Sequence, residues 1–245
     1  MIEFTFLGTN GSCQSFDSGN TSLLVSSGKY AFAADLSCNI PAVIDADIDV
    51  LVLTHEHIDH VYGFPSFLHQ SWLRGRKKPL TVYVPEGMEY IPEGMLSLFK
   101  IREKKGMFDI EILPVCSFIL GTMQVSFFST DHTAASVGLI VEENGKKLVY
   151  TSDTRPIPAE TRPAERADVL IHEASGSSVN EEILVKKGHS SGKDAAELAN
   201  AMNAGELFIC HLPMDSAAQR EVEGDALRIF RNTLIPLPLK KYCVM

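Results

Sequence analysis

Residues 49–60 read Asp-Val-Leu-Val-Leu-Thr-His-Glu-His-Ile-Asp-His, a short apolar run followed at once by three histidines and an aspartate. The apolar run, Val50 to Leu53, holds β-branched residues and no polar side chain, which predicts a strand buried on both faces. The polar residues follow the carboxyl end of this strand, where open α/β sheets hold their ligands. The stretch therefore predicts a ligand site at the end of a buried strand.

The residue types in this stretch indicate metal binding. His55 and His57 are two positions apart, so in extended backbone their side chains point the same way. Asp59 and His60 are adjacent, so they diverge and reach a second point in space. Imidazole and carboxylate are ligands that Zn²⁺, Fe and Mn accept. The alternative is a polar loop that happens to be rich in histidine, and finding three of the chain's 8 histidines so close together argues against it.

The composition is that of a globular protein. The length of 245 residues suits one domain, which we place at residues 1–245. Hydrophobic residues make up 45% of the chain and charged residues 22%, which excludes a disordered chain. No apolar run approaches the ~20 residues of a transmembrane helix, so we expect no membrane partner.

The cysteines and the amino terminus predict a reduced, cytoplasmic protein. The chain has five cysteines, an odd number, and they are too scattered to form a disulfide framework. Residues 1–4 lack the basic and apolar segments of a secretory signal. The net charge of −9 argues against nucleic-acid binding across the whole surface but leaves a local basic patch open.

Strand-like runs recur, and several end in a polar residue. We predict strands at 2–7, 21–25, 30–34, 50–53, 79–85, 110–115, 123–129, 137–142, 147–151, 168–171 and 207–210. Helices are predicted at 41–47, 64–72, 194–203 and 219–233, and residues 86–106 form either one helix or helices broken at Pro92 and Gly94. Five polar residues stand just past apolar runs, which suggests ligands gathered along one sheet edge: His55, His132, Asp153, His172 and His211.

The pattern His-x-His-x-Asp-His resembles the signature of the metallo-β-lactamase superfamily. The resemblance implies a four-layer αββα sandwich of the α/β class with a mono- or binuclear metal site. It assigns His55, His57 and His132 to a first metal ion. It assigns Asp59, His60 and His211 to a second, with Asp153 bridging the two. Such ions lower the pKa of a bound water from 15.7 to about 7, so hydroxide is available at neutral pH.

Two later motifs look like those of the ribonuclease Z branch of this superfamily. Residues 172–175, His-Glu-Ala-Ser, resemble its His-Glu-Ala-Thr motif, and residues 189–191, His-Ser-Ser, resemble its His-Ser-Thr motif. In that branch the second histidine is thought to give a proton to the leaving oxygen. The resemblance implies that His189, assisted by His172 and Glu173, does so here. Asp59 is counted with these three as catalytic.

The chain also departs from that branch. Only 20 residues separate His132 from Asp153, and a tight hairpin fills them, which leaves no room for a tRNA-gripping arm. Residues 212–214, Leu-Pro-Met, stand where the branch usually has a serine and an arginine that help hold phosphate. We therefore expect a binuclear phosphodiesterase acting on a small or nucleotide-like substrate. Its expected cofactors are two divalent ions, zinc first, with manganese or iron as alternatives.

Other functions stay open. The chain could be a ribonuclease Z-like enzyme that contacts RNA through the basic run Arg74–Lys78, which otherwise is a solvated loop. It could hydrolyse an ester, lactone or thioester, or be an inactive metal-binding scaffold. A homodimer is also left open.

Three smaller questions also remain. Asp35 either orients a metal ligand or caps a turn. Residues 8–12 are better read as a tight turn beside the site than as a phosphate cradle, because no P-loop lysine follows. His69 is expected to be an ordinary helix residue.

Overall fold

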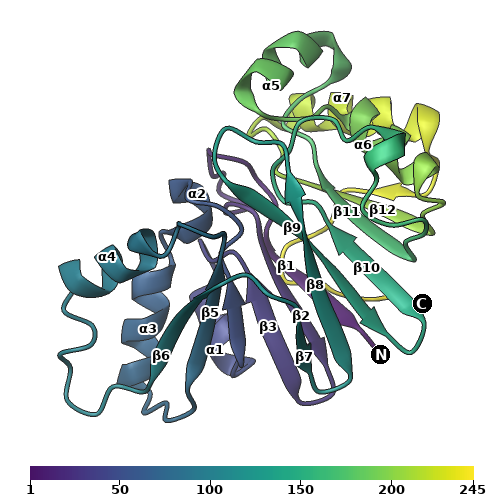
Figure 1. Cartoon of the computed structure of the whole chain (residues 1–245). Helices are drawn as coiled ribbons and strands as arrows, with labels where there is room; N and C mark the ends of the chain where they lie inside the picture. Colours follow the sequence, from purple (N-terminus) through teal and green to yellow (C-terminus); the bar gives the residue numbers. More distant parts are fainter.

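Two sheets packed face to face form the centre of the molecule, which a computed structural model describes over residues 1–245 (Figure 1). The first sheet has the order β14-β1-β2-β3-β4-β5-β6 and the second β13-β12-β11-β10-β9-β8-β7. The strands of the first are β1 (Glu3–Gly8), β2 (Ser22–Ser27), β3 (Tyr30–Ala34), β4 (Val50–Val52), β5 (Leu80–Val84), β6 (Ile110–Pro114) and β14 (Lys241–Cys243). Those of the second are β7 (Phe118–Leu120), β8 (Met123–Thr130), β9 (Ser136–Glu143), β10 (Lys146–Tyr150), β11 (Val169–Glu173), β12 (Glu206–Cys210) and β13 (Thr233–Leu234).

Helices cover the outer face of each sheet, which completes the predicted αββα sandwich (Figure 1). On the first sheet lie α1 (Ile40–Asp45), α3 (Phe64–Leu73) and α4 (Tyr90–Leu98), with the short α2 (Ile58–Val61) at its edge. On the second lie α6 (Gly192–Ala201) and α7 (Ser216–Ile229). The one-turn helices η1 (Ala159–Thr161) and η2 (Ser178–Asn180) and the helix α5 (Glu181–Lys187) lie in the connecting loops.

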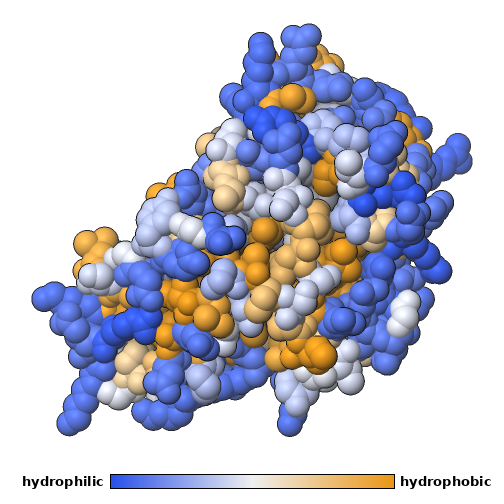
Figure 2. Space-filling view, in the orientation of Figure 1, coloured by the Kyte–Doolittle hydropathy of each residue, from blue (hydrophilic) through white to orange (hydrophobic).

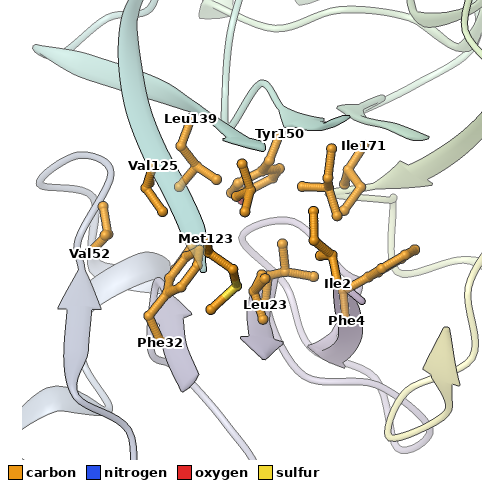
Figure 3. Packing of buried hydrophobic residues seen from close by; sticks show 14 of the residues in the cluster. Ile2, Phe4, Leu23, Phe32, Val52, Met123, Val125, Leu139, Tyr150 and Ile171 are labelled. Carbon is orange, nitrogen blue, oxygen red and sulfur yellow. The ribbon is translucent and has the colours of Figure 1, made fainter. Parts of the chain in front are cut away.

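The core between the sheets is built from alternate residues of the strands, as the two-residue period of a strand requires. Figure 3 shows side chains from the two sheets meeting there: Ile2, Phe4, Leu23, Phe32 and Val52 from the first, and Met123, Val125, Leu139, Tyr150 and Ile171 from the second. Because this core fixes the two sheets relative to each other, it also fixes the loops at their shared edge.

Strand direction explains why the predicted site residues meet. Strands β3, β4 and β5 run parallel, so Asp35 and His55 leave the same edge of the first sheet. Strands β10, β11 and β12 are also parallel. Strand β8 runs the same way as β10, because both are antiparallel to β9. The carboxyl ends of four strands of the second sheet therefore face the end of β4.

Several predicted elements need correction. Of the two alternatives for residues 86–106, the structure has one unbroken helix, α4, but it covers only Tyr90–Leu98. Pro92 does not break it, because Pro92 lies in its first turn, where no backbone N–H is required. No helix was predicted before Gly188, where the structure has α5, a helix too short to show a clear apolar period. The last helix begins at Ser216, where Asp215 caps it, rather than at residue 219, and ends at Ile229 rather than at residue 233. Strands β7, β13 and β14, of two or three residues each, were not predicted.

Other local predictions are confirmed. The hairpin between β9 and β10 turns through Asn144 and Gly145, both at positive φ, as a type I′ turn requires. The helix predicted at 194–203 is α6 (Gly192–Ala201), and Ser191 and Asp194 form a capping box at its start. All five cysteines are free.

The basic run Arg74–Lys78 does not form a phosphate-binding patch beside the site. Arg74 pairs with Asp45 at 2.9 Å, and Arg76, whose side chain is 7% exposed, pairs with Asp47 at 3.1 Å. The run precedes β5, so it lies at the opposite end of the parallel strands from the carboxyl ends where His55 lies. Contact with RNA through this run is therefore not supported.

The surface carries exposed apolar residues but no membrane span. Figure 2 shows hydrophobic residues gathered on the face over which β6, β7 and β8 run, and Ile119 of β7 is 75% exposed. Leu98 and Phe99, at the end of α4, are also exposed. None of the helices combines the length and the hydropathy needed to cross a bilayer. The homodimer and the cytoplasmic location stay predictions.

Candidate metal centre

The seven predicted ligands lie together at the shared edge of the two sheets. His55 and His57 follow β4, and Asp59 and His60 are in α2. His132, Asp153 and His211 follow β8, β10 and β12. The structure groups them as two sets that each bring their ligand atoms within 4.8 Å of one another. The first set is His55, His57, His132 and Asp153, and the second is Asp59, His60 and His211.

Asp153 lies between the two sets. Its Oδ2 is 3.6 Å from Nε2 of His55 and 3.9 Å from Nε2 of His132 in the first set. The same oxygen is 3.5 Å from Nε2 of His60 and 3.1 Å from Nε2 of His211 in the second. One carboxylate thus faces ligand atoms of both sets, which is the position a bridging ligand occupies.

Each of these four histidines is held by its other ring nitrogen. Nδ1 of His60 donates to Asp35 at 2.7 Å, and Nδ1 of His132 donates to the carbonyl of Gly188 at 2.8 Å. Nδ1 of His211 lies 2.8 Å from Ser175 Oγ, and Nδ1 of His55 lies 3.1 Å from Thr54 Oγ1. Such contacts select the tautomer in which Nε2 is a lone-pair donor to a metal.

The atoms that face the centre fit divalent ions. Nε2 of His55, His60 and His211 and Oδ1 of Asp153 are buried and have no hydrogen-bond partner. Leaving these four buried atoms without a partner would cost free energy of folding, and two bound cations would give each of them a partner. Nδ1 of His57 and Nε2 of His132 are only 3.0 Å apart, a second place where two ring nitrogens converge.

The electrostatics of the centre favour an ionised Asp153. Burial alone would raise the pKa of this carboxyl, but His211, His60 and His55 hold it well below its usual range. Burial and the neighbouring His60 lower the pKa of His55, which keeps its imidazole neutral. At His60 burial would lower the pKa, but Asp153 and Asp35 raise it well above its usual range, so a metal ion bound there would have to displace a proton.

Asp35 orients a predicted ligand, the first of the two roles left open for it. It is fully buried, and besides His60 it accepts hydrogen bonds from the backbone N–H of Thr54 at 2.8 Å and from its hydroxyl at 2.9 Å. Asp35 therefore fixes both the ring of His60 and the loop that carries His55.

A second network holds His189 beside the predicted ligands. Nδ1 of His189 donates to Glu173 Oε1 at 2.8 Å, and its ring stacks on His211 with centroids 5.0 Å apart. Burial would lower the pKa of His189, but the hydrogen bond and the charge of Glu173 raise it. His189 could also join Asp153 and His211 as a ligand set, but its Nδ1 is already engaged.

His172 is not brought to the centre. It is fully buried, and its Nδ1 bonds to the carbonyl of Glu173 at 2.7 Å. Its side chain alternates with those of Ile171 and Glu173, so it lies on the face of β11 that α6 covers. The structure gives no geometric support to its predicted part in proton transfer.

Three residues without a predicted role also shape the centre. Ser175 links His211 to Glu173 through hydrogen bonds of 2.8 and 3.0 Å. A Cβ atom at Gly11 would lie 2.9 Å from the ring of His211, and one at Gly188 would lie 2.8 Å from Nδ1 of His132. Gly11 confirms that residues 8–12 turn beside the site. The glycines could not be found from spacing, because their partners are about 200 and 56 positions away.

A cavity of about 450 Å³ opens beside His189 and His211. Leu184, Leu212 and Pro213 contribute apolar wall, and Lys187 is the one lysine or arginine that lines it. His69, by contrast, stacks on Trp72 outside both metal sets, as expected of an ordinary helix residue.

Comparisons with known proteins agree with this geometry. A family model described as a beta-lactamase superfamily domain matches residues 31–212. Ribonuclease Z from Latilactobacillus sakei is 27% identical, over 78% of this chain and 78% of its own length. Ribonuclease Z from Archaeoglobus fulgidus is 25% identical, over 96% and 95%. The metallo-beta-lactamase fold protein YhfI from Bacillus subtilis superposes with a TM-score of 0.82 at 18% identity, covering 98% of each chain.

Proposed function

We propose that this protein is a binuclear phosphodiesterase. The chain belongs to the ribonuclease Z-like branch of the metallo-β-lactamase superfamily. The family, the relatives and the two ligand sets support a metal-dependent hydrolase that binds divalent ions. A phosphodiester substrate, zinc as the metal and the roles of individual residues are parts of the proposal.

The proposed ligands are the seven residues around Asp153. His55, His57 and His132 would hold one ion, and Asp59, His60 and His211 the other, with Asp153 between them. Divalent ions bound there lower the pKa of water to about 7 and offset negative charge on a phosphoryl oxygen. The imidazole-rich donor set suits zinc best among common divalent ions.

His189 supplies what divalent ions do not, a proton for the leaving group. Glu173 accepts from Nδ1, so the free nitrogen is Nε2, and the ring of His189 lines the cavity. The raised pKa of His189 keeps its imidazole protonated closer to neutral pH. As the phosphorus–oxygen bond to the leaving group breaks, Nε2–H can protonate the departing alkoxide while water supplies the new oxygen on phosphorus.

The proposal of a phosphodiester substrate depends mainly on one observation, the hydrogen-bonded pair of His189 and Glu173 beside Asp153. An alkoxide is a poor leaving group unless it is protonated, so a positioned acid suits a phosphodiester. A thioester gains less from such an acid, because the thiolate it releases leaves readily without a proton.

The test is hydrolysis of bis(p-nitrophenyl) phosphate by the zinc- or manganese-loaded protein, beside an acetyl ester, a lactone and a pre-tRNA. We expect phosphodiester turnover, and a loss of about 10²-fold or more in His189→Ala with the metal content unchanged. Because p-nitrophenolate leaves readily without a proton, the loss should be larger on a dinucleotide.

The other substrates separate the alternatives. Turnover of the lactone or ester alone would replace the proposal by a carboxylic-ester hydrolase. Efficient pre-tRNA cleavage would favour a ribonuclease. A protein that binds two ions and hydrolyses nothing would be a scaffold.

A further inference from the structure

We propose that Lys187 binds a second anionic group of the substrate, so that the preferred substrate is a phosphodiester that carries an additional phosphate. The inference rests on the proposed function and assigns a substrate class to the same site. It starts from the cavity of about 450 Å³ beside His189 and His211.

The charges that surround the cavity are unbalanced. Asp59, Asp153 and Glu173 lie at or behind its floor, and the whole chain has a net charge of −9. Two bound cations would neutralise one phosphodiester group but would not attract a second anion farther along the cavity. A cationic side chain on the cavity wall would therefore favour substrates that carry a second anionic group over those that carry one.

Lys187 is the cation in that position. It occupies the last turn of α5, two residues before His189, and it lines the same cavity as His189 and His211. Its side chain is exposed and takes part in no ion pair or hydrogen bond within the structure. Asp215, the acidic residue on the cavity wall, is already used, because its Oδ1 accepts from the backbone of Ala217 and Ala218.

The position of Lys187 is fixed from both sides. Gly188 follows it at a φ of 88°, and its carbonyl accepts a hydrogen bond from Nδ1 of His132, which ties the end of α5 to the predicted ligands. Two residues before Lys187, the carbonyl of Val185 accepts a hydrogen bond of 2.8 Å from Nε of Arg155. Helix α5 projects at the top of the molecule in Figure 1. Its last residue, Lys187, lines the cavity together with His189 and His211.

Lys186 provides a matched control. It is the adjacent residue of the same helix and is also exposed and without an ion pair, but it lines a separate hollow along α5. Replacing either lysine by alanine changes the net charge by the same amount. A difference between the two variants therefore reports on position and not on overall charge.

The experiment compares three adenine dinucleotides with the metal-loaded protein: ApA, its 5′-phosphorylated form pApA and its 3′-phosphorylated form ApAp. We expect at least one phosphorylated form to have a KM about fivefold or more below that of ApA at low salt. In Lys187→Ala the KM for ApA divided by the KM for the preferred phosphorylated form should fall towards one. In Lys186→Ala this ratio should be the same as in the wild type. In Lys187→Arg the preference should be retained.

The outcomes separate this inference from the function it rests on. A wild-type protein that hydrolyses neither ApA nor bis(p-nitrophenyl) phosphate contradicts the phosphodiesterase itself. Turnover of ApA with no preference for either phosphorylated form overturns the assignment of Lys187 and leaves the phosphodiesterase intact. The assignment is equally overturned when Lys187→Ala and Lys186→Ala change the ratio alike.

Discussion

Ser175 is the residue through which the carboxylate of Glu173, which holds His189 directly, also reaches His211. Its hydroxyl donates to Glu173 Oε2 and accepts from Nδ1 of His211, while Glu173 Oε1 accepts from Nδ1 of His189. Glu173 also accepts from the backbone of Thr154, next to Asp153. A proposed metal ligand and the proposed proton donor are therefore oriented by the same buried group, and a change at Ser175 should affect the ligand first.

Ser175→Ala should weaken binding at one of two metal sites. His211 would lose the acceptor that fixes its tautomer, and losses of this kind cost about 10- to 100-fold in metal affinity. Titration calorimetry of the metal-free protein should show one site weakened and the other retained. Ser175→Thr keeps the hydroxyl and should restore the affinity. Equal affinities in wild type and Ser175→Ala would show that the hydroxyl does not position His211.

The glycine-rich turn after β1 acts as an element that confines His211. Gly11 donates its N–H to the carbonyl of Leu212 at 2.8 Å, and Leu212 donates back to Thr9 at 2.9 Å, so the turn and the His211 loop are hydrogen-bonded to each other. A side chain at Gly11 has no room, because its Cβ would meet the His211 ring. The turn therefore supplies no metal ligand itself but holds His211 in place by contact.

Gly11→Ala should displace His211 and lower the metal content of the purified protein. The matched control is Gly94→Ala, because a Cβ at Gly94 meets nothing within 4 Å and lies inside helix α4. The control should keep both metals and gain about 0.5–1 kcal/mol of stability, since alanine favours a helix over glycine. Elemental analysis and thermal unfolding measure both effects, and full metal content in Gly11→Ala would contradict the role of the turn.

What could be predicted from the sequence depends on the range of the interactions involved. The strand from Val50 to Leu53 and the Asn144–Gly145 hairpin depend on neighbouring residues, so their patterns are readable. Helix α5 is too short for a period to appear, and β7, β13 and β14 exist because a neighbouring strand pairs with them. Close approaches such as Gly11 to His211 depend on chain packing, which no local pattern records.

The candidate site shows the same division. The convergence of seven residues was predicted from strand ends and family resemblance, and the structure brings them together. The position of His172 was misjudged because its motif places it next to Glu173, whereas alternation along β11 sends the two side chains to opposite faces.

At the scale of the whole molecule, Glu143 ties the two sheets together. It lies at the end of β9, accepts a hydrogen bond of 2.6 Å from Ser27 of β2 and another from Thr122, and pairs with the amino group of Met1 at 2.6 Å. Burial would raise the pKa of Glu143, but these partners lower it to about 2. Its folded pKa is thus below its usual value of 4.5, so its ionised form stabilises the folded state.

Glu143→Gln should destabilise the protein by about 2 kcal/mol at pH 7. The sign follows from the lowered pKa: the contribution is complete above about pH 4.5 and disappears as the pH falls towards 2. Denaturant unfolding of wild type and variant should therefore converge on acidification. Glu142→Gln is the control, because Glu142 is 44% exposed and pairs only with Lys147. A difference that is independent of pH would contradict this account.

The central claim is that two divalent ions lie on either side of Asp153, and the most direct measurement is anomalous diffraction from crystals of the zinc-loaded protein, recorded above and below the zinc edge. The account predicts two peaks, one among His55, His57 and His132 and the other among Asp59, His60 and His211, with Asp153 reaching both. No peak, a single peak, or peaks held by other residues would contradict it.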